Sequence, residues 1–184
     1  MGTVPSRPMP RDLTGYGEAP PDPRWPGGAR VAVSFVLNFE EGAETSVAEG
    51  DARNEAVYEV IDRLEGRPDP CLESHFDYGT RVGWWRIMKA FDDAGARCTV
   101  SACGRAVERT PALAADAVRR GHEVSAHGWR WESHATMAEA DERRAIADTV
   151  TAIAHATGVR PVGWHTRSAS SPTSTASSVC WVAR

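Results

Sequence analysis

Short apolar runs alternate with amphipathic stretches along the chain after residue 28. The run Ala29–Leu37 is rich in β-branched residues and almost continuously apolar, which is typical of a strand buried on both faces of a sheet. Residues 97–103, 122–126 and 159–164 also have strand character, and each follows a glycine that ends an amphipathic stretch. The pattern therefore predicts four strands with helices between them.

The amphipathic stretches carry apolar residues at the spacing of an α-helix. Residues 56–64, 84–91 and 113–118 each form one apolar face, and the longest candidate helix covers about residues 137–157. Thr110–Pro111 is suited to the N-cap and first turn of the third helix. The expected order of elements is therefore β, α, α, β, α, β, α, β.

Strands that alternate with amphipathic helices indicate an α/β fold, either a doubly wound parallel sheet or a (β/α) barrel. A complete eight-unit barrel needs about 250 residues, whereas this chain has 184 residues and four strand candidates. A barrel formed by this chain would therefore be incomplete. We divide the chain into an irregular Pro/Gly-rich arm (1–28), the α/β domain (29–167) and a low-complexity Ser/Thr tail (168–184).

The composition excludes several classes of protein. The chain is 41% hydrophobic and 25% charged, which fits one globular domain and excludes disorder throughout. A net charge of −4 leaves no basic excess for nucleic acid. No apolar run approaches the roughly 20 residues that cross a bilayer, and the amino terminus lacks the apolar core of a signal peptide. We therefore expect a cytoplasmic protein without membrane contact. Its four cysteines form no CxxC pair, so we expect them to be plain thiols.

Chemically versatile side chains follow three of the predicted strands, in residues 38–42, 125–131 and 163–167. The carboxyl ends of parallel strands meet on one face of a sheet, so these loops should share one cleft. Glu40 and Glu41 could hold a divalent cation or share a proton and act as a base. Alternatively, they solvate a loop or begin a helix. His127 likewise fits either proton transfer or a structural hydrogen bond. The presence of two glutamates and a histidine at the same predicted edge favours catalysis.

Three tryptophans, Trp129, Trp131 and Trp164, lie in loops that should be polar. They could form flat walls for a planar or sugar-like substrate, or they could cap the open end of the sheet. His134 would share a face with His127 only if a helix continued through Trp131.

In this order, the three loops resemble the motifs of the polysaccharide deacetylase superfamily, whose fold is an irregular (β/α) barrel. The first family motif reads Thr-Phe-Asp-Asp-Gly, and residues 38–42 of this chain read Asn-Phe-Glu-Glu-Gly. The family's metal-binding motif has a second histidine four residues after the first, and this chain has Trp131 four residues after His127. The resemblance therefore implies that the usual Asp-His-His metal site is absent.

These departures are similar to those of one branch, the metal-independent allantoinases of purine breakdown, often labelled chitooligosaccharide deacetylase or urate catabolism protein. The resemblance covers residues 10 to about 167, and this branch has tyrosine where this chain has His165. The remaining barrel strands and the carboxy-terminal histidine of the family are absent. We therefore expect a truncated chain, with residues from about Ser170 read in the wrong frame. The matching segments include Pro10–Leu13, Pro23–Gly27, Ser34–Gly42, Ser125–Trp131 and Arg160–Trp164.

The resemblance implies a hydrolase that opens the hydantoin ring of allantoin to allantoate without a cofactor, and that forms homo-oligomers at full length. Attack of water on a cyclic amide requires a base, an oxyanion donor and an acid for the leaving nitrogen. Glu40, Glu41 and His127 are the catalytic candidates. The candidates for binding the ureide substrate are Asn38, Glu73, Arg81, Trp131, Trp164 and His165.

Two alternatives remain open. A zinc-dependent deacetylase of N-acetylated sugars would need a second imidazole near His127. The chain could also be an inactive fragment or a binding module that retains part of a barrel.

Overall fold

The computed structural model describes residues 13–58, 60–167 and 171. The chain divides into two units, residues 1–34 and 35–184. Residues 13–34 are exposed throughout and contain the short 3-10 helix η1, Pro26–Gly28. Most of the tail that the sequence predicts over residues 168–184 lies outside the described residues.

A parallel sheet forms the centre of the second unit, in the order β1-β2-β3. Its strands are β1 (Val36–Phe39), β2 (Thr99–Ala102) and β3 (Glu123–Ala126). In register, Val36 pairs with Thr99, which pairs with Glu123. The predicted α/β class with a parallel sheet is confirmed, with three strands in the described part of the chain where four were expected.

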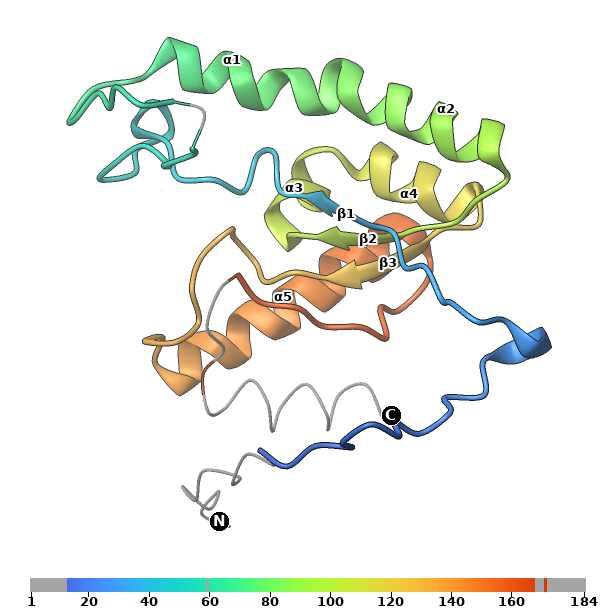
Figure 1. Cartoon of the computed structure of the whole chain (residues 1–184). Helices are drawn as coiled ribbons and strands as arrows, with labels where there is room; N and C mark the ends of the chain where they lie inside the picture. The colour runs from blue at the N-terminus through green and yellow to red at the C-terminus, as the bar shows by residue number, and fades with distance from the viewer. Residues whose placement is uncertain (1–12, 59, 168–170, 172–184) are drawn as a thin grey trace. The chain divides into compact units, whose positions relative to one another are not determined.

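In the described part of the chain, five α-helices accompany this sheet. Figure 1 shows α1 and α2 along the β1 side and α5 along the β3 side, and α5 packs against both α3 and α4. None of the helices in the described residues is long and apolar enough to cross a membrane. The helices are α1 (Pro70–Tyr78), α2 (Trp84–Ala94), α3 (Gly104–Arg109), α4 (Pro111–Arg119) and α5 (Glu139–Thr157), with the 3-10 turn η2 (Val47–Glu49) and the π-helix η3 (Gly79–Gly83).

The core lies between the sheet and the helices. Its largest apolar side chains without solvent contact are Phe39, Met88, Val100, Val107 and Ile153. Trp84 of α2 also packs against Phe39, and its indole N–H donates to the buried carboxylate of Asp116 in α4 at 3.1 Å. This bond satisfies two polar groups that burial would otherwise penalise, and it links α2 to α4.

The helix predicted over residues 56–64 is wrong. The segment is irregular, and Tyr58 and Ile61 are 100% and 89% exposed. The amide of Asn54 donates to the carbonyls of Leu64 and Arg67, both at 2.9 Å. An asparagine side chain that binds these carbonyls offers the backbone an alternative to helical hydrogen bonds.

Two predicted strands differ from the structure. The first covers residues 36–39 rather than 29–37, so Asn38 lies within it. Residues 29–35 are exposed, and in the described part of the chain the pairing of β1 with β2 begins at Val36–Thr99. The segment 159–164 forms a single bridge between Trp164 and Ala126 instead of a strand.

Helix α3 was not predicted, and it lies unusually close to α5. A Cβ atom on Gly104 would lie 2.6 Å from Cε3 of Trp129 and 2.8 Å from Cα of Thr149. Because the second neighbour is backbone, a side chain here would force α3 away from α5.

We expect Gly104→Ala to lower the free energy of unfolding by about 1–3 kcal/mol, as overpacking does in tight cores. Denaturant titration followed by circular dichroism measures this change. Gly83→Ala is the matched control, since its Cβ would meet Tyr78 at an ordinary 3.5 Å. Alanine there should be neutral or stabilise by up to about 1 kcal/mol. An equal loss of free energy of unfolding in both variants would show that the close approach of α3 and α5 does not matter for stability.

Candidate active site

The three strands end in register, which brings together the residues that follow them. Phe39 pairs with Ala102, and Ala102 pairs with Ala126. The next residues, Glu40 and His127, therefore leave the sheet at the same edge, on either side of the residue after Ala102. The convergence that the sequence predicts for the loops of β1 and β3 is visible at this edge as the contact between Glu40 and His127.

His127 is bound at both ring nitrogens. Its Nε2 lies 2.9 Å from Oε1 of Glu40, and its Nδ1 lies 3.0 Å from the carbonyl oxygen of His165. A carbonyl oxygen can only accept, so Nδ1 carries a hydrogen. The contact between Nε2 and the Glu40 carboxylate then holds one proton between them. With the His127 side chain only 2% exposed, this pair is shielded from solvent on the imidazole side.

The imidazole of His165 lies beside that of His127. The two rings are almost parallel, at 8°, with centroids 4.7 Å apart and Nδ1 atoms 3.0 Å apart. Although His165 is exposed, partial desolvation and the neighbouring His127 lower its pKa, and Glu40 opposes this shift. His165 is therefore neutral near pH 7 and can accept a hydrogen bond at Nδ1.

Glu41 points to a different partner from Glu40. Its Oε2 accepts from the backbone N–H of Glu40 at 3.2 Å, and a Cβ atom on Gly79 would overlap its other carboxylate oxygen. Burial is the main cause that raises the pKa of Glu41, and the charge of Glu40 adds to it. The two adjacent glutamates therefore have separate environments, one against His127 and one against η3.

Two small cavities adjoin Glu41. Each has a volume of about 190 Å³; Asn38 lines one and Glu73 lines the other. Glu73 also accepts a hydrogen bond from the Ser46 hydroxyl. These cavities place two of the predicted binding residues next to a predicted catalytic carboxylate.

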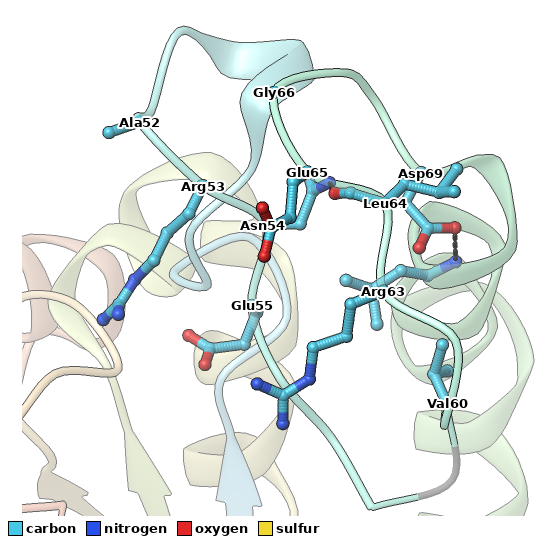
Figure 2. A pocket seen from close by; sticks show the side chains of 11 residues that line it. Ala52, Arg53, Asn54, Glu55, Val60, Arg63, Leu64, Glu65, Gly66 and Asp69 are labelled. Atoms are coloured by element: carbon cyan, nitrogen blue, oxygen red, sulfur yellow. Dashed lines mark hydrogen bonds between the residues drawn. The ribbon is translucent and has the colours of Figure 1, made fainter.

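Arg81 and the cavity before α1 are not part of this cluster. Arg81 lies in η3, where it pairs with Asp77 at 3.3 Å, and its side chain is 74% exposed. A larger cavity, of about 430 Å³, is lined by residues of the irregular segment before α1 and by Leu72 of α1 (Figure 2). None of the predicted site residues lines it.

Trp131 and Trp164 both pack against the core at the edge of the site. The guanidinium of Arg167 lies 3.7 Å above the ring of Trp131 and donates to the carboxylate of Glu55 at 3.2 Å. The ring of Trp164 lies edge-on to His134, with centroids 5.8 Å apart. Each indole is thus partly covered by another side chain. This agrees with a structural role as well as with a flat wall of a substrate site.

The sequence pattern did not indicate the buried pair of His134 and Glu142. Both side chains are 0% exposed, and Nδ1 of His134 lies 3.0 Å from Oε1 of Glu142. A Cβ atom on Gly128 would lie 3.1 Å from Nε2 of His134. The chain turns back after Gly128, at φ +83°, so no helix is needed to bring His134 beneath it.

Arg130 was also missed, although it connects the loop of His127 to that of Glu40. It donates to both carboxylate oxygens of Asp51, at 2.8 and 2.6 Å, and to the carbonyl of Glu44 at 2.7 Å. Arg130 lowers the pKa of Asp51 to about 2. A bidentate pair of this kind fixes the geometry of both loops.

The donor set does not fit a bound zinc ion. Both nitrogens of His127 already have partners within the protein, and Trp131 stands where the family motif has its second imidazole. Among residues 13–58, 60–167 and 171, no three His, Cys, Asp or Glu side chains form a group that could hold a metal ion.

We expect Glu41→Gln to raise Tm at pH 7. The pKa of Glu41 is raised in the folded state, so its ionisation costs stability above that pKa and costs none below the unfolded value of about 4.3. The gain in Tm should therefore shrink as the pH falls through the raised pKa of the folded state and vanish below about 4.3. Thermal unfolding across pH 4–8 measures it. Glu108→Gln, at an exposed position of α3, is the control. A gain that persists in acid, or a lower Tm at pH 7, would contradict this account.

Comparisons with known proteins show which family and which solved structures the chain is similar to. The polysaccharide deacetylase family model matches residues 65–179, which extends beyond residue 167, where we expected the resemblance to end. The crystal structure of PuuE allantoinase is 40% identical, with a TM-score of 0.82 over 94% of this chain and 58% of that one. A probable polysaccharide deacetylase from Pseudomonas aeruginosa PAO1 is 41% identical, with a TM-score of 0.82 over 93% of this chain and 57% of that one.

A candidate polysaccharide deacetylase of Schizosaccharomyces pombe is 35% identical over 167 residues, which cover 87% of this chain and 52% of the relative. The chain thus spans little more than half the length of the relatives it matches. Because the family match covers more than half of the chain, and two solved structures share its fold, the chain belongs to the polysaccharide deacetylase family.

Proposed function

We propose that this chain contributes the Glu40–His127 pair of a hydrolase that opens the hydantoin ring of allantoin to allantoate. The observation that carries the proposal is the bonding of His127. Nδ1 is held by the His165 carbonyl, so Nε2 shares one proton with Glu40. Such a pair can move protons without a metal ion. The 40% identity to PuuE allantoinase supports the same substrate class.

Glu40 acts as the base. Its side chain is 17% exposed and one oxygen is held by His127, which leaves the other oxygen for a water molecule. The carboxylate takes a proton from the water while the water oxygen adds to a ring carbonyl carbon. When the ring C–N bond breaks, the same proton passes from Glu40 to the leaving nitrogen, which balances the reaction. His127 positions the Glu40 carboxylate through the contact at Nε2.

The cavities beside Glu41 suit a small ureide. Such a molecule carries several N–H donors, and the carboxylates of Glu41 and Glu73 and the amide oxygen of Asn38 are acceptors. Trp131 and Trp164 provide flat surfaces at the same edge of the sheet.

The likeness to the probable polysaccharide deacetylase from Pseudomonas aeruginosa PAO1 favours a second candidate, the deacetylation of N-acetylated sugars. A metal-dependent version of that reaction needs a ligand at the position that Trp131 occupies. The two candidates therefore differ in their response to chelators.

We expect the protein to convert allantoin to allantoate at the same rate with and without EDTA. His127→Ala should lower kcat/KM by about 10² or more, as expected for a group in proton transfer. Production of allantoate and release of acetate from N-acetylated sugars are measured side by side. His155→Ala, at an exposed position of α5, is the control. Release of acetate that EDTA abolishes and zinc restores would establish the second candidate instead.

A second prediction separates the two adjacent glutamates. Glu40→Gln removes the base and should lower kcat by about 10² or more. Glu41→Gln keeps the acceptor oxygen for the Glu40 N–H and should lower kcat less than tenfold while raising KM. Steady-state kinetics with allantoin measure both. The reverse order of effects would make Glu41 the base.

A further inference from the structure

The buried imidazole of His127 meets a solvent-exposed imidazole on the side opposite Glu40. The backbone of His165 is fixed there by the bridge to β3, where its N–H donates to the carbonyl of Ala126 at 2.9 Å. As a result, both the carbonyl and the ring of His165 lie 3.0 Å from Nδ1 of His127. One residue therefore presents two different acceptors to the same N–H group.

These acceptors do different things. The carbonyl oxygen holds the hydrogen on Nδ1 but is too weakly basic to take it as a proton. The imidazole nitrogen of neutral His165 can accept the proton itself. Its lowered pKa keeps His165 neutral near pH 7, and the charged or titratable groups that act on it are His127 and Glu40.

We propose that His165 is a proton-exchange residue, through which the buried His127 exchanges its Nδ1 proton with solvent. The inference rests on the proposed function for its role in turnover. Ring opening yields a carboxylic acid and a weakly basic ureido nitrogen, so when the acid ionises beside Glu40 its proton is added to the Glu40–His127 pair and has to reach solvent. His127 is 2% exposed and cannot deliver it directly.

The exchange step is balanced as follows. In the imidazolium form of His127, the Nδ1–H bond breaks and a new bond forms to Nδ1 of His165. His127 is left neutral, with its remaining hydrogen on Nε2 towards Glu40. His165 becomes the cation and releases the proton on its Nε2 to water. The reverse sequence recharges His127, and no other reactant is required.

The test measures proton exchange directly in the whole chain with ¹⁵N-labelled histidine. In His165→Tyr, the residue of the allantoinase branch, the carbonyl remains but the side chain does not titrate near pH 7. We expect the Nδ1–H of His127 to be retained and its exchange with solvent to slow about tenfold or more. His155→Tyr should leave the exchange rate unchanged.

His165→Gln provides a second variant should tyrosine disturb folding. Without the ring the site is more open, so a role as a simple cover predicts faster exchange, whereas the relay predicts slower exchange. Unchanged or faster exchange in both variants would overturn the proposal. The measurement needs no substrate: slower exchange in a protein that does not convert allantoin would refute the proposed function alone. Turnover of allantoin with unaltered exchange would refute the relay alone.

Discussion

The common end of three parallel strands is the constraint on which the site depends. Parallel strands pair with a regular register, and here all three stop at the same level, at Phe39, Ala102 and Ala126. Glu40 and His127 are 87 residues apart in sequence, yet each is the first residue beyond its strand. A one-residue slip of register would reverse the side of the sheet to which each side chain of the slipped strand points and separate the pair.

A backbone carbonyl then decides the chemistry of His127. The single bridge between Ala126 and Trp164 brings the carbonyl of His165 to Nδ1, and this carbonyl requires a hydrogen there. Nε2 is consequently the ring nitrogen that can exchange a proton with Glu40. A histidine that donates one ring N–H to a fixed acceptor is the usual means of selecting a tautomer, and here the acceptor comes from a segment that is not a strand.

The sequence predicted those features that depend on local periodicity. Helices α2, α4 and α5 follow from their apolar spacing, and Gly95 and Gly158 end two of them in the left-handed conformation. The strand-end loops were also predictable, because a parallel sheet requires them to converge. The irregular fold of residues 56–64 was not, since it depends on hydrogen bonds of Asn54 to carbonyls that lie 10 and 13 residues away. The divergence of Glu41 from Glu40 likewise depends on the π-helix beside it.

Ion pairs hold the irregular loop that carries Glu40. Arg130 binds Asp51, and Arg105 and Arg109 both bind Glu49. The pKa of Asp51, lowered to about 2, means that this carboxylate is charged in the folded protein across the pH range in which histidine titrates. Its stabilising contribution is complete above the unfolded value of about 3.9 and is lost only as the pH falls through about 2. Protonation of His165, whose pKa is lowered, can therefore change the charge of the site in mild acid without releasing the loop that positions Glu40.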